Sequence, residues 1–400
     1  MELAEKRIAL GITGGIAAYK SAELVRLFVK QGASVQVAMT QAATHFVSPT
    51  TFHALSGNRV FTDPWDSNTD KGLAHINFSR EADVLVVAPA SANFIAKAAN
   101  GIADDLLSTL TLARNRPLLL VPAMNAQMWL NPATQRNVAV LRADGVTILG
   151  PASGEQACGE IGEGRMIEPE EILEDVIAFL QPKHLIGKRV LVTAGPTFET
   201  IDPVRGITNL SSGKMGFAVA RAARESGADV TLVSGPVNQP TPRGVSRIDV
   251  TTALEMHAAV LRQANDIDVF IAVAAVADYR PKVVTAHKVK KDAGSPPTID
   301  LVQNPDILSD VVALPNPPFC VGFAAESRNL AEYAEKKRRA KKIPLIVGNL
   351  IQNGFGGDEN TLTLFDDHGQ TQMASAPKLH LARQLMARIA MLLKENDAAH

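Results

Sequence analysis

The chain has 400 residues, of which 46% are hydrophobic and 20% charged, and its formal net charge is -1. This length predicts two or three domains, each large enough to bury its own core. The balanced charge argues against a nucleic-acid partner, because no basic excess is present to neutralise phosphates. No apolar run approaches the roughly 18 residues that span a bilayer, so we expect no membrane partner.

The first residues and the cysteines indicate the compartment of the protein. Residues 1–7 lack the apolar core of a signal peptide. Only Cys158 and Cys320 occur, far apart and without metal-binding spacing around them. A reducing compartment suits this pattern better than disulfides or zinc do, so the sequence predicts a cytoplasmic protein.

Internal repetition predicts the fold class. Three segments of the first half are echoed in the same order in the second half, where each begins with similar residues and continues as an apolar run. Because each echo fits a strand with a small-residue turn, we expect an α/β protein with two doubly wound, Rossmann-like domains in tandem. Neither half contains G-x-G-x-x-G, so an ordinary NAD fingerprint is absent. The echoing pairs are residues 6–14 and 188–195, 32–40 and 227–235, and 82–89 and 267–274.

In the first half, a buried strand is expected over residues 8–12, followed by a turn at 13–17 and a helix over 19–30. Backbone N–H groups at such a helix start form an anion site, and glycine lets a phosphate approach closely. A tight strand-to-helix turn without a ligand explains the same pattern equally well, since such loops are common.

Two further strands are expected over residues 84–88 and 118–121, and each is followed by a loop of small and amide residues. In open α/β sheets, ligands bind outside the carboxyl ends of the strands, so these loops suit a flat polar cofactor. Asn125, in the second loop, could also be the N-cap of a helix over Ala126–Leu130, and taken alone the cap is favoured.

These motifs together resemble the flavin-dependent cysteine decarboxylases. The resemblance implies a flavodoxin-like domain with FMN, whose phosphate lies at the first turn and whose ring lies beside the two later loops. The motifs are residues 11–20, His75, 89–93, 122–125 and 157–166. The implied FMN-binding residues are Thr13, Gly14, Gly15, Ile16, Ala17, Thr40, Ser91, Asn93 and Met124.

The same resemblance implies roles for individual side chains. In this family the cysteinyl side chain is oxidised to a thioaldehyde, carbon dioxide leaves, and the resulting enethiol is reduced. His75 matches the acid/base histidine, Asn125 the residue that holds the substrate carboxylate, and Cys158 the proton donor of the final reduction. Without the resemblance, a packed or surface imidazole would be the usual interpretation of His75, and a buried inert thiol that of Cys158. Cys158 lies in a glycine-rich stretch that is typical of a mobile flap, and Arg165 and Met166 after it would contact substrate.

The second half begins after an amphipathic helix expected over residues 167–180 and a linker at 181–187. We therefore expect domains at 1–182 and 183–400. A strand over 269–277 ends at Asp278, again a polar group at a strand's carboxyl edge. A charged helix over 332–342 carries lysines on one face, which charge alone would assign to a solvated surface. The alternative is a cationic clamp on a polyphosphate, with Asp278 near a divalent metal.

This half resembles phosphopantothenate–cysteine ligase, and the whole chain resembles the bacterial bifunctional phosphopantothenoylcysteine synthetase/decarboxylase family. The resemblance implies CTP-dependent joining of 4′-phosphopantothenate to cysteine through an acyl-cytidylate, with Mg²⁺ or Mn²⁺. Lys288 would stabilise charge on the transferred phosphate, and Asn209 would position the intermediate, with Arg205 and Ala275 near substrate. The implied CTP-binding residues are Asp278, Lys288, Asn304, Pro305, Asp306, Ile307, Phe323, Lys337 and Lys341, with Asp278 also at the metal.

One departure from the ligase pattern stands at Gly206, where relatives commonly carry a bulky residue. It leaves open how rigidly Arg205 is held. The resemblance also implies a homo-oligomer in which decarboxylase trimers are joined by ligase dimers into a dodecamer. Two alternatives are a flavoprotein reductase with an NAD(P)-binding second half, and a flavin-binding regulatory protein. The absence of dinucleotide fingerprints disfavours the first, and the presence of His75, Asn125 and Cys158 disfavours the second.

Overall fold

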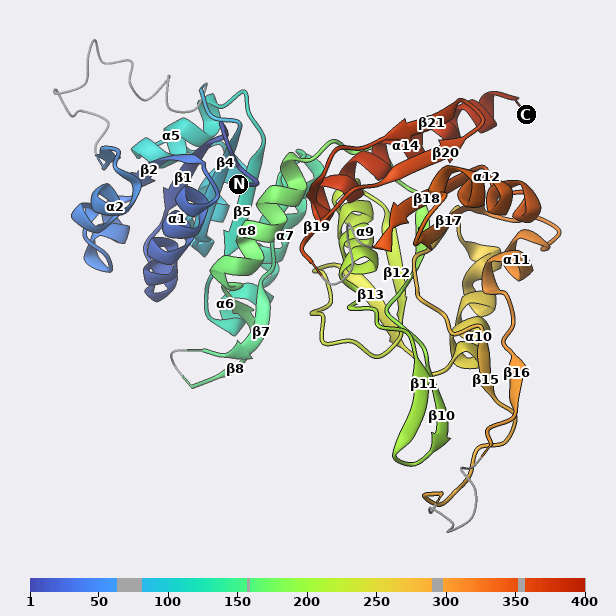
Figure 1. Cartoon of the computed structure of the whole chain (residues 1–400). Coiled ribbons are helices and arrows are strands. Elements are labelled where there is room, and N and C mark those ends of the chain that lie inside the picture. The colour runs from blue at the N-terminus through green and yellow to red at the C-terminus, as the bar shows by residue number, and fades with distance from the viewer. Residues whose placement is uncertain (63–80, 157–158, 290–297, 352–356, 400) are drawn as a thin grey trace. The chain divides into compact units, whose positions relative to one another are not determined.

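The computed structural model describes residues 1–62, 81–156, 159–289, 298–351 and 357–399. It divides into two compact units, Met1–Phe179 and Leu180–His400, which are considered separately. Figure 1 shows that each unit is a twisted sheet with helices on both faces. This is the α/β architecture that the internal repeats predicted.

Unit 1 has a six-stranded parallel sheet in the order β3-β2-β1-β4-β5-β6. Without the two-residue edge strand β3, the order is the one found in flavodoxin-like folds, with its switch point between β1 and β4. The strands are β1 (Arg7–Ile12), β2 (Ser34–Met39), β3 (Val60–Phe61), β4 (Val84–Ala90), β5 (Leu118–Pro122) and β6 (Thr147–Ile148), with β7 (Ala152–Glu155) and β8 (Ile161–Arg165) forming a separate antiparallel pair.

Several helices of unit 1 begin where the sequence provides a capping side chain. Ser48 precedes Pro49 and accepts the Thr50 N–H, and Asp105 and Ser108 form a reciprocal capping box. The helical segments are η1 (Ile16–Tyr19), α1 (Lys20–Lys30), η2 (Gln41–His45), α2 (Pro49–Ser56), α4 (Ala92–Asn100), α5 (Leu106–Ala113), α6 (Ala126–Leu130), α7 (Pro132–Ala143) and α8 (Pro169–Leu180).

Unit 2 has an eight-stranded sheet in the order β13-β12-β9-β14-β17-β18-β20-β21. The first six strands are parallel and repeat the topology of unit 1, so the three sequence echoes correspond to strands that occupy the same places in both sheets. These strands are β9 (Arg189–Ala194), β12 (Asp229–Ser234), β13 (Val245–Asp249), β14 (Val269–Ala272), β17 (Phe319–Glu326), β18 (Leu345–Leu350), β20 (Thr363–Asp366) and β21 (Gly369–Gln372), and β19 (Glu359–Asn360) pairs with β22 (Ala376–Pro377).

The core of unit 2 lies on both faces of this sheet. In β9, Val190 and Val192 face one hydrophobic cluster and Leu191 faces another, as expected for a strand buried on both sides. The first cluster lies under α9 (Lys214–Glu225) and α14 (Lys378–Ala399). The second lies under α10 (Ala253–Gln263), η4 (Ala264–Asp266), α11 (Ile307–Val312) and α12 (Leu330–Lys341).

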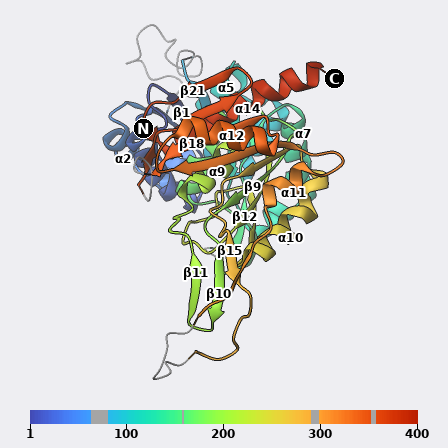
Figure 2. The ribbon, with the colours of Figure 1, turned by 45° about the vertical axis from the view of Figure 1, so that its right-hand side comes forward.

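Two excursions leave the sheet of unit 2 and run side by side. β10 (Phe198–Asp202) pairs with β11 (Arg205–Thr208), and β15 (Tyr279–Pro281) pairs with β16 (Leu301–Gln303). Figures 1 and 2 both show these hairpins projecting from the sheet, with β10 next to β15. We call the part built from β10, β11, β15, β16 and the described residues 282–289 the hairpin extension.

The predicted strand over 269–277 is wrong in its second half, because β14 ends at Ala272. Beyond that residue the regular ladder stops, and only Ala275 still pairs through its backbone, with the loop after β9. The N–H groups of Ala274 and Ala277 donate to the hydroxyl groups of Thr193 and Thr197, at 3.3 and 3.0 Å. Side-chain acceptors at long sequence separation therefore replace two ladder partners in a segment that the apolar pattern alone would continue as strand.

Candidate functional sites at the carboxyl edges of two sheets

Thr13 braces the switch point of unit 1. Its hydroxyl group donates to the Pro89 carbonyl oxygen at 2.8 Å and accepts the Ser91 N–H at 2.9 Å. The side chain is 1% exposed. Thr13 therefore ties the end of β1 to the end of β4, and its hydroxyl group is not presented at the surface where a ligand would lie.

The two glycines in the turn after β1 differ in their surroundings, because Gly14 packs against the protein and Gly15 faces open space. A Cβ atom on Gly14 would lie 2.6 Å from the Ala42 Cβ, so only glycine lets this turn pack against η2. A Cβ atom on Gly15 would meet nothing within 4 Å. Ile16 and Ala17 continue this outward side, and Ile16 is exposed. The open side of the turn fits the approach of a phosphate to backbone N–H groups.

Hydroxyl groups flank this turn at the ends of β2 and β4. Thr40 accepts the Ala43 N–H and Ser91 accepts the Phe94 N–H, each at 3.3 Å, so both hydroxyl oxygens cap the helical segments that follow. A hydroxyl group that accepts through its oxygen still has a proton to donate. Asn93 is exposed and Met124 half-buried at the same edge. The expected FMN residues other than Thr13 therefore present donors or surface at one sheet edge.

Asn125 caps α6 and also presents its amide nitrogen to a carboxylate, which are the two roles that the sequence left open. Its Oδ1 accepts the Gln127 N–H at 2.8 Å, which makes it the N-cap of α6, as predicted. Its Nδ2 donates to Oε2 of Glu160 at 2.6 Å. Because the cap uses Oδ1, the amide nitrogen is directed outward, and it recognises an acceptor such as a carboxylate.

The β7–β8 hairpin lies directly on α6 and on the loop before it. The Gly164 carbonyl accepts the Met124 N–H at 2.9 Å, and Oε1 of Gln156 accepts the Ala126 N–H at 3.0 Å. Gly164 has φ 127°, and a Cβ atom there would lie 2.5 Å from the Met124 carbonyl oxygen. Glu163 accepts the Trp129 Nε1–H at 3.2 Å. The glycine-rich stretch that suggested a flap is therefore needed for close contact with α6.

The residues expected to contact substrate at the end of this hairpin are largely engaged with the protein. Met166 is 2% exposed, and its carbonyl oxygen accepts from Lys20 Nζ at 3.1 Å. Arg165 forms an ion pair with Glu168 at 2.6 Å, and Lys20 forms a second one at 2.9 Å. The hydrogen bond from Lys20, with that from Arg165, lowers the pKa of the Glu168 carboxyl group. Lys20 and Glu168 were not singled out from the sequence.

His75 and Cys158 lie outside the described residues, and their expected roles stay predictions.

In unit 2, Asn209 connects two loops at the carboxyl edge of the sheet. Its Nδ2 donates to the carbonyl oxygens of Ala275 and Val276, at 3.0 and 3.2 Å. Ala275 also accepts the Thr197 N–H, and its own N–H donates to Gly195. The expected substrate residues Asn209 and Ala275 therefore lie together, where the segments after β9, β11 and β14 meet.

The expected nucleotide residues around Asp278 also gather at this edge. Asn304 is 7% exposed, its Nδ2 donates to the Ala277 carbonyl oxygen at 2.8 Å, and its Oδ1 accepts from Arg280 at 3.0 Å. Its N–H donates to the Asp278 carbonyl oxygen at 2.8 Å. Asn304 is therefore a brace that places the exposed Asp278 beside the start of α11. Pro305 is half-buried there, and the Ile307 side chain points into the core.

Two lysines from α12 approach the same place, as their spacing predicted. Lys341 forms an ion pair with Asp306 at 2.6 Å, and Lys337 donates to the Phe323 carbonyl oxygen at 3.3 Å. Burial, and secondly the charge of Lys341, lowers the pKa of Lys337. Burial opposes ionisation of Asp306, but hydrogen bonds from Lys341 and the Ser309 N–H outweigh it and lower its pKa.

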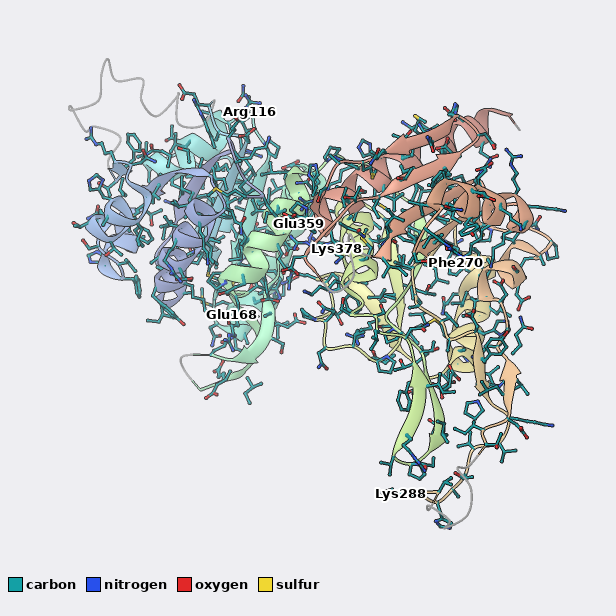
Figure 3. All side chains as sticks on the ribbon, in the orientation of Figure 1. Arg116, Glu168, Phe270, Lys288, Glu359 and Lys378 are labelled. Carbon is teal, nitrogen blue, oxygen red and sulfur yellow. The ribbon has the colours of Figure 1, made fainter. Side chains whose placement is uncertain are left out.

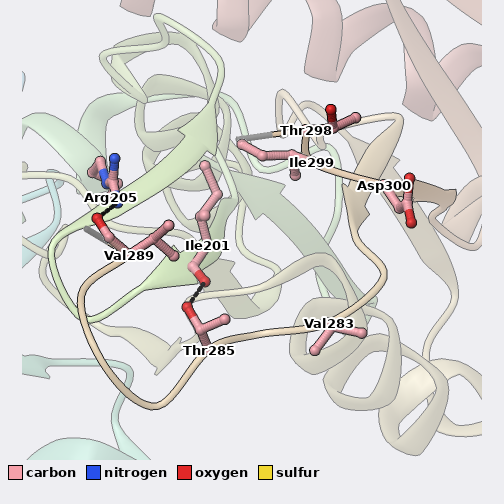
Figure 4. A pocket seen from close by; sticks show the side chains of 8 residues that line it. All are labelled: Ile201, Arg205, Val283, Thr285, Val289, Thr298, Ile299 and Asp300. Atoms are coloured by element: carbon pink, nitrogen blue, oxygen red, sulfur yellow. Dashed lines mark hydrogen bonds between the residues drawn. The ribbon is translucent and has the colours of Figure 1, made fainter. Parts of the chain in front are cut away.

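Lys288 is not brought to this cluster. Figure 3 shows it at the far tip of the hairpin extension. The adjacent Val289 is fixed there, because its N–H donates to Asp202 at 3.2 Å and its carbonyl oxygen accepts from Arg205 at 2.9 Å. A cavity of about 350 Å³ lies at this point (Figure 4), lined by Ile201, Arg205, Val283, Thr285, Val289, Thr298, Ile299 and Asp300.

Gly206 does not leave Arg205 loose. Arg205 forms an ion pair with the buried Asp202 at 2.5 Å, and this hydrogen bond is the main cause that lowers the pKa of the Asp202 carboxyl group. A Cβ atom on Gly206 would clash with the Phe198 ring, which occupies the space where relatives were expected to have a bulky residue. The expected uncertainty about Arg205 is therefore resolved by Asp202, a residue given no role from sequence.

Within the described ranges, no group of three or more His, Cys, Asp or Glu side chains is arranged to hold a metal ion. No helix in the same ranges is both long and apolar enough to cross a membrane.

Comparison with known protein families agrees with the division into two units. Residues 1–181 match the family described as Flavoprotein, and residues 185–393 match the DNA/pantothenate metabolism flavoprotein C-terminal domain. The chain is thus a flavoprotein of pantothenate metabolism with two α/β units, each with a polar site at the carboxyl edge of its sheet.

Relatives match both units at once. The chain is 51% identical to the coenzyme A biosynthesis bifunctional protein CoaBC of Vibrio cholerae, over 96% of this chain and 98% of that protein. It is 47% identical to the protein of the same name from Escherichia coli K12, over 99% of this chain and 100% of that protein. A crystal structure of the C-terminal domain of a CoaBC protein is 40% identical and covers 53% of this chain and 99% of that chain, with a TM-score of 0.47. The chain belongs to the family of CoaBC bifunctional proteins of coenzyme A biosynthesis.

Proposed function

We propose that unit 2 joins 4′-phosphopantothenate to cysteine at the expense of CTP, and that unit 1 decarboxylates the resulting phosphopantothenoylcysteine to 4′-phosphopantetheine. Similarity to CoaBC proteins over nearly the whole chain supports both activities. For the decarboxylase, the observation that carries the proposal is the Asn125 amide, which donates to a carboxylate at 2.6 Å at the sheet edge where FMN would bind.

FMN is the cofactor that the flavoprotein match favours. The open side of the turn at Gly14, Gly15, Ile16 and Ala17 would hold its phosphate, with donors from the two flanking hydroxyl groups. Asn93 and Met124 would lie along its ring. When bound, FMN supplies the oxidation and reduction of the carbon that bears the substrate thiol.

The chain's own groups supply the rest of the decarboxylation. Asn125 holds the substrate carboxylate through Nδ2, while its Oδ1 stays in the α6 cap. Arg165, the last residue of β8, would contact substrate, and Met166 supports the base of the hairpin through its backbone. His75 acts as the acid/base group and Cys158 delivers the proton that completes the reduction, so Cys158→Ser should release carbon dioxide but accumulate the enethiol.

For the ligase, the CTP triphosphate would lie over the cluster around Asp278. Lys337 and Lys341 provide positive charge, and Asp306 with Asn304, Pro305 and Ile307 provides the helix start. Phe323 contributes the strand edge that Lys337 contacts. Mg²⁺ or Mn²⁺ would bind Asp278 and the phosphates, since Mg²⁺ commonly uses one or two carboxylates plus substrate oxygens.

Lys288 would stabilise the transferred phosphate, but it lies at the tip of the hairpin extension. Its role therefore requires either bending of the extension or its contribution to the site of a second copy, as the expected homo-oligomer would allow. Mixing Lys288→Gln protein with Lys337→Gln protein distinguishes bending of the extension from contribution to a second copy. If Lys288 contributes to the partner copy, a 1:1 mixture recovers up to about a quarter of the wild-type activity, because about half of the dimers are mixed and each of these has one complete site of two. No restoration means that Lys288 acts within its own chain.

The experiment that tests the whole proposal is to measure carbon dioxide and pyrophosphate release separately in the purified, flavin-loaded protein. A fragment of residues 1–182 should be yellow and release carbon dioxide from phosphopantothenoylcysteine, provided that it needs no contact from the second half. Oxidation of NADH without CTP-dependent pyrophosphate release would instead favour the reductase alternative. The expected cytoplasmic location and dodecameric assembly remain part of the proposal.

A further inference from the structure

A carboxylate of the protein already occupies the amide that the proposed function assigns to the substrate carboxylate. Oε2 of Glu160 accepts from Asn125 Nδ2 at 2.6 Å, within the short range of charge-assisted hydrogen bonds. Glu160 lies just before β8 in the β7–β8 hairpin, 35 residues along the chain from Asn125. Its carboxylate thus has the charge and the acceptor oxygens of the ligand that Asn125 would bind.

Asn125 is poorly suited to hold both carboxylates at this position. Its Oδ1 is committed to the Gln127 N–H, so the side chain is not expected to turn over and present a different group. Two carboxylates at the same amide nitrogen would bring like charges close together, which disfavours their joint ionisation. The amide nitrogen has a second N–H, but a substrate carboxylate that accepted it would lie beside the charge of Glu160, so substrate binding at Nδ2 competes with the Glu160 carboxylate.

The hairpin itself need not undock when Glu160 leaves. Three other contacts hold it to the α6 region: Gln156 with the Ala126 N–H, Glu163 with Trp129, and the Gly164 carbonyl with the Met124 N–H. Glu160 is exposed, so its side chain has solvent to turn into. A side-chain rotation is therefore sufficient for exchange.

We propose that Glu160 is a specificity-determining residue that competes with the substrate carboxylate for Asn125 and takes the amide back once the carboxylate has left as carbon dioxide. The inference rests on the proposed function of unit 1. It implies that ligands with a carboxylate bind against this competition, whereas ligands without one leave the Asn125–Glu160 contact intact. Glu160 thereby weakens substrate binding without weakening the binding of the decarboxylated product.

Two unreactive probes test this competition in the flavin-loaded, full-length protein. One is the phosphopantothenoyl derivative of serine, which keeps the carboxylate but has no thiol to oxidise. The other is the matching derivative of ethanolamine, which lacks the carboxylate. Calorimetric titration gives the Kd of each probe for the wild type, for Glu160→Gln, and for Glu155→Gln, which removes the same charge from an exposed position on β7 of the same hairpin.

Glu160→Gln should tighten binding of the serine derivative about fivefold, because a neutral amide competes less well for a donor than a carboxylate does. Its affinity for the ethanolamine derivative should stay within about twofold, and Glu155→Gln should change neither affinity by more than this. In steady-state decarboxylation, Glu160→Gln should lower KM without raising kcat.

An equal change for both probes would overturn the inference, because it would mean that the substitution alters the hairpin as a whole. Unchanged or weaker binding of the serine derivative would overturn it too, since Glu160 would then not compete. In either case, wild-type binding of the serine derivative together with carbon dioxide release would leave the proposed function standing. A wild-type protein that binds neither probe and releases no carbon dioxide would overturn the proposed function itself, and the inference with it.

Discussion

Replacing Asn209 by aspartate should separate the two half-reactions of the ligase. The side chain keeps its size, but its amide nitrogen, which donates to the carbonyl oxygens of Ala275 and Val276 at 3.0 and 3.2 Å, becomes an acceptor. Each lost hydrogen bond is worth roughly 0.5–1.5 kcal/mol net, so the tie between the two loops weakens by about 2 kcal/mol. Repulsion between the new carboxylate and two carbonyl oxygens adds to this, although exposure of residue 209 lets solvent screen it.

The loop after β14 has a second, independent tie. Asn304 donates to the carbonyl oxygens of Ala277 and Asp278 and so holds the nucleotide side of the loop. Asn209→Asp should therefore leave formation of the acyl-cytidylate within about threefold of wild type. Transfer to cysteine should slow about 30-fold, which corresponds to a loss of about 2 kcal/mol.

The assay follows pyrophosphate release, which reports the first half-reaction, and CMP release, which reports the second, in single turnovers with CTP. Asn209→Ala is the matched control, because it removes the same two hydrogen bonds without adding charge, and the difference between the two variants isolates the repulsion. Lys288→Gln should instead abolish pyrophosphate release. Equal slowing of both steps in Asn209→Asp would refute the reasoning, as would unchanged kinetics in both Asn209 variants.

Three further outcomes follow from the described contacts. Burial lowers the pKa of Lys337. Its ammonium group therefore loses its proton at a lower pH than an ordinary lysine, whose pKa is about 10.4. The KM for CTP should therefore rise with pH in the alkaline range, and Lys337→Arg should flatten that rise; parallel profiles would contradict this. Gly164→Ala places a Cβ atom 2.5 Å from the Met124 carbonyl oxygen at φ 127°, so strain of about 2 kcal/mol should lower carbon dioxide release while pyrophosphate release is unchanged. Glu225→Ala removes the buried carboxylate that Arg383 contacts at 2.6 Å. Urea denaturation should show that the free energy of unfolding of unit 2 falls by about 3 kcal/mol, and a fall of less than about 1 kcal/mol would contradict this.

The sequence predicted the linker between the two domains only in part. Residues 181–187 follow α8 without regular secondary structure, as expected. Leu185 is nevertheless 1% exposed within the core of unit 2, and Lys183 Nζ donates to the Glu225 carbonyl oxygen. Packing therefore assigns the second part of the linker to unit 2, which composition could not show. Whether residues 1–182 fold alone stays a prediction.

The sequence by itself determined the two doubly wound domains, because apolar runs of strand length and small-residue turns repeat in the same order. It also determined that polar residues at the strand ends would meet at one edge of each sheet, since all carboxyl ends of parallel strands share that edge. Local spacing was sufficient for the α6 cap at Asn125 and for the shared face of Lys337 and Lys341, because these depend on residues two to four positions apart.

Only the tertiary structure decided which of these polar groups are turned inward and which outward. Thr13 donates to the Pro89 carbonyl oxygen, and the hydroxyl groups of Thr193 and Thr197 accept N–H groups of the segment that follows β14. Asp202 holds Val289 at the tip of the hairpin extension. Glu160 reaches Asn125 across 35 residues. Each of these contacts joins segments far apart in the chain, so its partner is fixed by packing and close backbone approach rather than by any local pattern of residues.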